Sequence, residues 1–185
     1  MRRLFVLPAV LALAFLALAP LSAAGQNMDK ENTLYIDLEY GRVVILMRPD
    51  LAPKHVAQIK KLAREGKYDG IVFHRVIPGF MAQTGDPDGT GSGGMGERLP
   101  SEFSEEPHVR GTVSMARTSD PNSARSQFFI CFADSRFLDK QYTVWGKVVS
   151  GMEYVDKIKK GEGQSGSVRN PDKMLKVRVA ADVKE

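Results

Sequence analysis

The amino-acid sequence predicts a mainly β domain, a closed eight-stranded antiparallel barrel with two α-helices. About eight short segments alternate between apolar and polar residues or are apolar throughout, as strands are, and only two segments show helical spacing. The strand segments are separated mostly by turns, which favours antiparallel pairing over a doubly wound parallel sheet. The length of 185 residues fits one domain.

The first 24 residues have the pattern of a cleavable export signal. Arg2 and Arg3 precede an uncharged run over residues 4–19, and small residues, Ser22 and Ala24, stand where cleavage needs them. The run is shorter than the roughly 20 residues of a spanning helix, so a retained anchor is the weaker alternative. We therefore expect cleavage after Ala24, no membrane anchor afterwards, and a periplasmic location, with release beyond the cell as the alternative.

The charge gives no reason to expect a nucleic-acid partner. The chain has 26 Lys and Arg against 22 Asp and Glu, a net charge of +4, and removing residues 1–24 with their two Arg lowers it to +2. The basic residues are scattered and form no stripe of the kind that binds nucleic acid. A polar linker, residues 25–32, is expected before the domain at residues 33–185, which we expect to be monomeric.

The elements follow in order along the domain. Residues 33–40 alternate with period two, Gly41-Arg42 is expected to form a tight connection, and residues 43–47 return as a second strand. A helix follows, with Asp50 or a near neighbour as its cap, Pro53 in its first turn and Gly66 at its end. The other strands are expected at residues 71–77, 79–83, 111–116, 127–133, 143–149 and 174–183, with a glycine-rich loop at 86–96 and a short helix at 151–159.

The residues that usually carry metal or nucleophilic chemistry form no motif. His55, His74 and His108 are not spaced to pair with a Cys or another His, so no metal and no cofactor are expected. Cys131 lies in an apolar run and is expected to be a buried, inert thiol. No Gly-x-Ser-x-Gly elbow or defensible Ser/His/Asp arrangement is found. Gly89-x-Gly91-x-x-Gly94 lacks the flanking strand and helix of a dinucleotide site, so a turning loop is the better interpretation.

Three runs place polar side chains beside large apolar ones. In the first, Arg75 and Gln83 lie an even number of residues apart across a reversal at Pro78-Gly79, so both can project to the same side. In the second, Gln127 stands beside two Phe residues, and the third adds apolar surface. Taken singly, each of these residues is best interpreted as a surface charge or a core residue. The three runs are residues 73–83, 126–130 and 137–146.

Together the runs resemble the signature of the cyclophilin family. The Phe-His-Arg run at 73–83 is followed, in the order of the family, by Met115-Ala116-Arg117 and by the two later runs, and the resemblance covers most of residues 33–183. It implies a barrel capped by two helices and peptidyl-prolyl cis–trans isomerase activity without a cofactor. The partners implied are proline-containing polypeptides, and with the export signal the resemblance implies help in the folding of exported proteins.

Carried over position by position, the resemblance implies that Arg75 is the catalytic residue. The segment Ala116-Arg117 is implied to contact the main chain of the residue before the proline. Arg117 stands where Asn is common, which implies a shifted peptide preference and not a loss of activity. The implied substrate-binding residues are Phe80, Met81, Gln83, Ala116, Arg117, Gln127, Phe129, Phe137, Leu138 and Tyr142.

Two other functions stay open as alternatives. A domain of this kind could bind proline segments without turnover, although such a module can dispense with Arg75 and this chain retains it. A holding chaperone would need a large apolar surface outside the barrel, and the chain has little sequence to spare for one. Comparing prolyl-peptide isomerisation with suppression of aggregation separates these functions.

Overall fold

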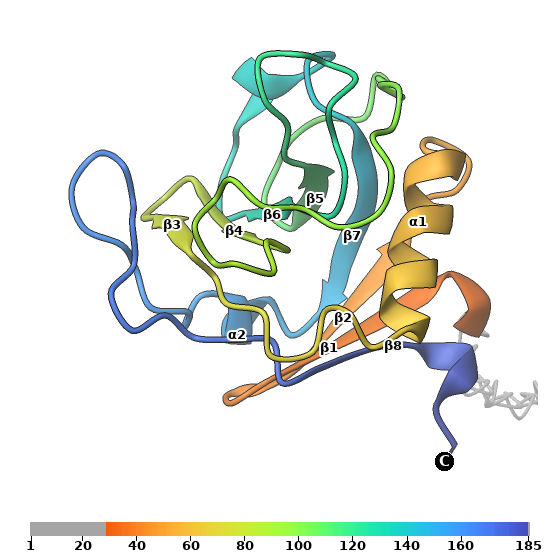
Figure 1. Cartoon of the computed structure of the whole chain (residues 1–185), viewed down its shortest axis with the longest axis horizontal. Coiled ribbons are helices and arrows are strands. Elements are labelled where there is room, and N and C mark those ends of the chain that lie inside the picture. The colour runs from red at the N-terminus through yellow and green to blue at the C-terminus, as the bar shows by residue number, and fades with distance from the viewer. Residues whose placement is uncertain (1–28, 185) are drawn as a thin grey trace, which may run out of the picture.

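One curled antiparallel sheet of eight strands forms the body of the protein, with two α-helices packed on it (Figure 1). The computed structural model describes residues 29–184; the predicted export signal and residues 25–28 of the predicted linker lie outside the described residues. The strands are β1 Thr33–Leu38, β2 Gly41–Met47, β3 Arg75–Ile77, β4 Met81–Thr84, β5 Thr112–Met115, β6 Phe128–Cys131, β7 Val144–Ser150 and β8 Lys176–Val179. The helices are α1 Pro53–Arg64 and α2 Met152–Val155, with 3-10 turns η1 Lys30–Asn32, η2 Arg136–Leu138 and η3 Ala180–Asp182.

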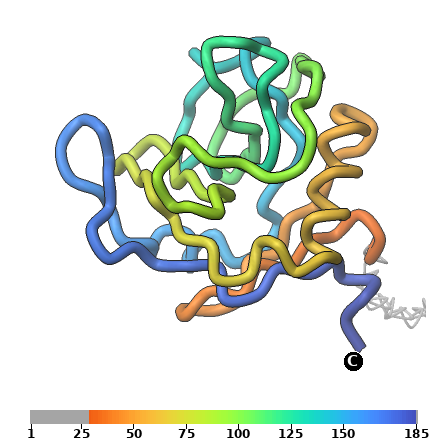
Figure 2. The backbone as a smooth tube through the Cα atoms, viewed as in Figure 1, coloured from red at the N-terminus to blue at the C-terminus, as the bar shows by residue number. Residues whose placement is uncertain are grey.

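The sheet is open, so the prediction of a closed barrel is not confirmed. The strand order is β3-β4-β6-β5-β7-β2-β1-β8, which leaves β3 and β8 as its edges. Only scattered backbone hydrogen bonds span the gap, such as Phe73 N to Asp172 O at 2.8 Å. Isolated antiparallel bridges, Val72 with Lys173 and Arg75 with Ser167, stand here in place of a regular ladder. Figure 2 traces residues 160–170, in blue, as a loop that stands out from the body near this gap.

Alternation along the strands places the core on the inner face of the sheet. In β1, Leu34 and Ile36 are buried while Tyr35 and Asp37 are half-buried, as the period of two predicts. The ladder between β2 and β7 and the ladder between β5 and β7 each contain a register shift. Shifts of this kind bend and twist the strands, which explains how one sheet curls around a single core.

The turn between β1 and β2 lies two residues earlier than predicted. Leu38 pairs with Gly41, so Glu39 and Tyr40 form the turn and Gly41 already belongs to β2. Gly41 is needed for a different reason: a Cβ atom there would lie 2.6 Å from the ring of Tyr154. The glycine that suggested a turn therefore allows α2 to pack closely against the hairpin.

Helix α1 is capped by a residue distant in sequence, so the prediction of a cap at or near Asp50 is wrong. Asp50 pairs with Arg48 instead, at 2.7 Å. The carboxylate of Glu102 accepts hydrogen bonds from the first-turn N–H groups of Lys54 and His55, both at 3.1 Å, and from His55 Nδ1 at 2.6 Å. These contacts satisfy donors that a helix start leaves unpaired and place a negative charge at the positive end of the helix dipole.

The interior is apolar and aromatic. Trp145 and Tyr68 are fully buried, and each packs edge-to-face against Phe128, at 5.4 and 5.8 Å between ring centroids. Cys131 is buried, as predicted, and burial raises the pKa of its thiol to about 12, which leaves it protonated and inert. No helix within residues 29–184 is both long and apolar enough to cross a bilayer.

Candidate active site

A hollow of about 310 Å³ gathers ten of the eleven predicted site residues. The eleventh, Gln127, lines the neighbouring hollow, but its side-chain oxygen accepts a hydrogen bond from Gln83 Nε2 at 2.9 Å. The structure therefore brings the whole predicted set together, although its members come from three strands, β3, β4 and β6, and from three connecting segments. The residues lining the hollow are Arg75, Phe80, Met81, Gln83, Ala116, Arg117, Phe129, Phe137, Leu138 and Tyr142.

The pairing of the strands places polar and apolar side chains next to each other in this hollow. Arg75 on β3 lies opposite Gln83 on β4, and Gln83 lies opposite Phe129 on β6. Directly paired residues share a face of the sheet, so these three side chains form one row across three strands. The prediction that Arg75 and Gln83 project to the same side is confirmed by the hydrogen bond from Arg75 Nη1 to Gln83 Oε1, at 3.1 Å.

The floor of the hollow is apolar and its rim is aromatic. Met81, Phe129 and Leu138 are buried and pack together. The ring of Phe129 packs edge-to-face against that of Tyr142, with 5.8 Å between centroids. At the rim, Phe137 is 66% exposed, and its ring centroid lies 5.3 Å from that of Phe80. A hollow of this size and composition suits a small apolar ring held against one polar wall.

Two acceptors fix the guanidinium plane of Arg75. Its Nε donates to the carbonyl oxygen of Ser165 at 3.0 Å, and its Nη1 donates to Gln83. An arginine has five N–H groups, and no residue in the described part of the chain uses those of Nη2. The side chain is therefore held in place while donors remain for a group in the hollow.

The glycine-rich loop is held by Gln127, which is also hydrogen-bonded to Gln83. Gln127 Nε2 donates to the carbonyl oxygens of Gly91 and Gly93, at 3.0 and 2.7 Å. Under the loop, the buried carboxylate of Asp86 accepts several backbone N–H groups, including that of Asp88 at 3.0 Å. Burial alone would raise the pKa of Asp86, but these bonds hold it below its ordinary value. Gly89 and Gly91 adopt positive φ angles, which confirms the turning loop.

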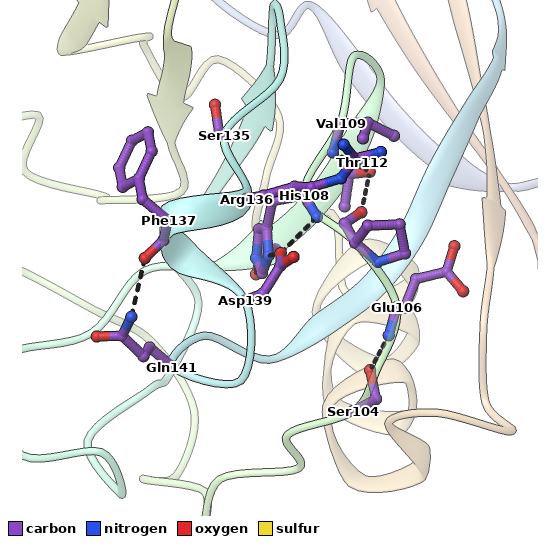
Figure 3. Close-up of polar contacts among 12 residues, drawn as sticks. Ser104, Glu106, His108, Val109, Thr112, Ser135, Arg136, Phe137, Asp139 and Gln141 are labelled. Atoms are coloured by element: carbon purple, nitrogen blue, oxygen red, sulfur yellow. Dashed lines mark hydrogen bonds and ion pairs between the residues drawn. The ribbon is translucent and has the colours of Figure 1, made fainter.

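Behind the apolar floor, half-buried Asp139 meets two buried residues, His108 and Ser114, in an arrangement that the sequence did not reveal (Figure 3 shows the first two). His108 Nδ1 lies 2.9 Å from Asp139, and Nε2 lies 3.0 Å from Ser114 Oγ. A carboxylate only accepts, so Nδ1 carries the proton. The single hydroxyl proton of Ser114 is shared between Nε2 and the carbonyl oxygen of Thr143, which lies 2.9 Å from Oγ. Burial lowers the pKa of His108, which keeps the ring neutral, despite the opposing effect of Asp139.

This arrangement matches a hydrolytic triad in connectivity but not in access. Ser114 and the His108 ring are fully buried, so no substrate carbonyl can reach the serine oxygen. The His108 ring instead stacks on Phe129, with 6.2 Å between centroids, and Asp139 directly follows Leu138. The group therefore supports the pocket floor from behind.

Two residues that help to build the site, Ser165 and His108, could not be identified from the sequence. Ser165 acts through its main-chain oxygen, which every residue type possesses, so its identity gives no signal. The sequence around His108 fits no motif, because its partners lie 6 and 31 residues away along the chain. No group of three or more His, Cys, Asp or Glu residues within 29–184 is placed to hold a metal ion.

Comparison with known proteins identifies the family. Residues 33–179 match the family model described as cyclophilin type peptidyl-prolyl cis-trans isomerase/CLD. A Brucella suis protein described as "probable peptidyl-prolyl cis-trans isomerase" is 56% identical, over 97% of this chain and 99% of its own length.

Solved structures agree with this result. A cyclophilin from Hirschia baltica has a TM-score of 0.76 and 31% identity, covering 85% of this chain and 77% of its own. A cyclophilin-type isomerase from Cryptosporidium parvum, solved in the presence of the dipeptide Ala-Pro, has a TM-score of 0.73 and 28% identity, covering 80% of this chain and 98% of its own. With this fold and this arginine-bearing apolar hollow, the chain belongs to the family of cyclophilin-type peptidyl-prolyl cis–trans isomerases.

Proposed function

We propose that this isomerase holds the proline ring of its substrate in the apolar hollow and uses Arg75 as the catalytic hydrogen-bond donor. The X–Pro bond rotates slowly because the nitrogen lone pair is shared with the carbonyl, which gives a barrier of roughly 18–20 kcal/mol. Rotation needs no nucleophile and no net proton transfer. It needs a site that favours the twisted amide over the two planar forms.

Arg75 suits this role because its donors act only on the twisted state. When the amide twists, the nitrogen lone pair is released and can accept a hydrogen bond from the Nη2 group that the described residues leave unused. In the planar substrate the lone pair is conjugated, so this bond stabilises the transition state selectively. The contacts with Ser165 and Gln83 hold the guanidinium plane before the substrate arrives, so little ordering is required during rotation.

The other pocket residues would hold the ring and the chain around it. The buried side chains of Met81, Phe129 and Leu138 would contact the pyrrolidine ring and exclude water, which strengthens the bond from the arginine. Gln83 and Gln127 would orient the substrate backbone. The Cryptosporidium relative, solved in the presence of Ala-Pro, supports proline-containing peptides as the ligands.

We also propose that the protein works on the folding of exported polypeptides. Support comes from the basic, apolar and small-residue pattern of residues 1–24, which is typical of a cleaved secretory signal. The mature protein would begin after Ala24 and act as a monomer in the periplasm. Slow prolyl isomerisation, on the order of 10–100 s uncatalysed, limits the folding of many such chains.

The test is the activity of Arg75→Ala in a prolyl-peptide isomerisation assay on mature protein. A charge-assisted hydrogen bond of about 1.5–3 kcal/mol predicts a loss of at least about tenfold in kcat/KM. Arg42→Ala is the matched control, because Arg42 pairs with Asp37 away from the hollow and its loss should leave kcat/KM unchanged. A folded Arg75→Ala protein with near wild-type turnover would overturn the proposed mechanism. Proline-peptide binding without turnover by the wild type would show a binding module instead.

A further inference from the structure

A second hollow, of about 340 Å³, adjoins the proposed proline pocket and is strongly basic. The two hollows share Gln83, Ala116 and Arg117 in their linings. Besides Arg117, the second hollow is lined by Arg98 and Arg125, and no Asp or Glu belongs to its lining. Three positive charges therefore surround a site into which a bound polypeptide can extend from the proline pocket.

The three guanidinium groups make no ion pair with any residue that the structure describes. Arg117 and Arg125 are tied to neutral carbonyl oxygens, those of Gln141 at 3.0 Å and of Gly96 at 2.9 Å respectively. Arg98 is exposed and makes no hydrogen bond within residues 29–184. Each arginine thus keeps its full charge. Arg125 keeps three N–H groups for a ligand, and Arg117, which also donates to the carbonyl oxygens of Thr118 and Ser119, keeps one.

Nearby acids do not neutralise this charge. Asp86, Glu97 and Asp120 are close in sequence to the lining residues, but none of them lines the hollow. The carboxylate of Asp86 is buried and engaged by backbone N–H groups of the glycine-rich loop, and that of Asp120 accepts a backbone N–H within its own turn. Asp88 Oδ2 lies 2.6 Å from where a Cβ on the lining residue Gly93 would be, but Asp88 does not line the hollow. None of these acids forms an ion pair with the three arginines within residues 29–184.

We infer that the second hollow binds the carboxylate of an Asp or Glu two residues before the substrate proline. The inference rests on the proposed function and on the contact that the resemblance to cyclophilins implies between the segment Ala116-Arg117 and the residue before the proline. An extended chain advances about 3.3–3.6 Å per residue, so the next residue upstream passes beyond this segment to the second hollow. Carboxylate oxygens match the planar fork of arginine donors, whereas a lysine side chain would be repelled.

The experiment compares kcat/KM for three peptides of the form X-Ala-Pro-Phe, with X as Glu, Gln or Lys. At low salt, Glu is expected to exceed Gln by about three- to fivefold and Lys to fall below Gln, which is the scale of partly exposed ion pairs. At about 0.5 M salt the preference should shrink, because the screening length becomes shorter than about 8 Å. Equal rates for the three peptides at low salt would overturn the inference.

Variants place the effect at this hollow. Arg98→Glu should abolish or reverse the Glu-over-Gln preference, and Arg98→Gln should reduce it. Lys157→Glu makes the same charge change at an exposed residue that lines neither hollow, so it should retain the wild-type ratio. A preference unchanged in both Arg98 variants, or lost in Lys157→Glu, would refute the assignment. If the wild type isomerises none of the three peptides, the proposed function itself fails.

Discussion

His108 shows how a buried residue that no substrate touches can still shape the site. Its ring stacks behind Phe129, and its Nδ1 holds Asp139, the residue that follows Leu138 (Figure 3). Two of the apolar side chains of the pocket floor are thus positioned by one imidazole. Ser114 completes the arrangement, with its Oγ 3.0 Å from the other ring nitrogen, Nε2.

We therefore predict that His108→Ala lowers kcat/KM for prolyl peptides by about tenfold or more, because misplacing bound groups by about 1 Å can cost 10²-fold. The loss should appear mostly in KM, since the pocket floor holds the proline ring in all states. His108→Phe keeps the stacking on Phe129 but loses the bond to Asp139, and it should fall between the wild type and His108→Ala. A folded His108→Ala protein with wild-type kcat/KM would contradict this role.

Among single residues, the sequence predicted those whose type carries the chemistry. Arg75 and Gln83 were found because their spacing across a reversal fits paired strands, and the register confirms it. His108 was missed because its importance comes from partners that only the folded chain brings close. Phe137 was grouped with the pocket residues, and the structure places it at the rim, mostly exposed.

Among the elements, the loop at residues 161–167 acts directly on Arg75. The Gly161 N–H donates to Val76 O at 2.8 Å, and the Gly166 carbonyl accepts from Val76 N at 2.7 Å. These two bonds fix the loop to the residue next to Arg75 and present the Ser165 carbonyl to the arginine Nε. The loop therefore supplies one of the two acceptors that orient the side chain proposed to be catalytic.

Two glycines of this loop provide a matched pair of variants. Gly166 and Gly163 both have positive φ angles, +69° and +61°, so Ala causes similar backbone strain at either site. A Cβ at Gly166 would lie 2.5 Å from Ile77 Cγ1, whereas a Cβ at Gly163 meets nothing within 4 Å. We therefore expect Gly166→Ala to push residue 166 away from β3 and with it the Ser165 carbonyl, and Gly163→Ala to leave that carbonyl in place.

The expected result is that Gly166→Ala lowers kcat about tenfold relative to Gly163→Ala, with little change in KM, because Arg75 is proposed to act on the transition state. The Arg75 Nε–H resonance in a nitrogen–proton NMR spectrum should move in Gly166→Ala and stay in place in Gly163→Ala. In an Arg75→Ala background, Gly166→Ala should cause no further loss of kcat. Equal kcat values for the two glycine variants would exclude this positioning role.

Element positions followed from periodicity, and most errors concern contacts between distant segments. The strands at β1 and β5 to β8 and both helices fall within or close to the predicted ranges. The cap of α1 was assigned to a local residue, whereas Glu102 provides it from nearly 50 residues away. Local patterns report which face of an element is buried, but they do not report which distant side chain reaches its end.

Across the whole molecule, all three histidines are buried, and burial lowers the pKa of each. Carboxylates oppose the shift: Glu102 beside His55, Asp86 near His74, and Asp139 beside His108. The unfolded chain takes up these protons near pH 6.5, while the folded chain resists until lower pH. The free energy of unfolding is therefore highest above pH 6.5, where the histidines are neutral in both states, and it falls as the solution is acidified.

We predict that the free energy of unfolding, measured by urea denaturation, is constant from pH 7.5 to 7 and falls between pH 6.5 and 5. Each histidine contributes a slope of up to about 1.4 kcal/mol per pH unit. The window isolates them, because the pKa of Glu102 lies below its ordinary value of 4.5 and that of Asp139 below 3.8. His74→Phe removes one titration, at a residue whose two ring nitrogens have no hydrogen-bond partner within residues 29–184, and should lower the slope by about a third. Stability that does not change between pH 6.5 and 5, or a His74→Phe slope equal to that of the wild type, would contradict the prediction.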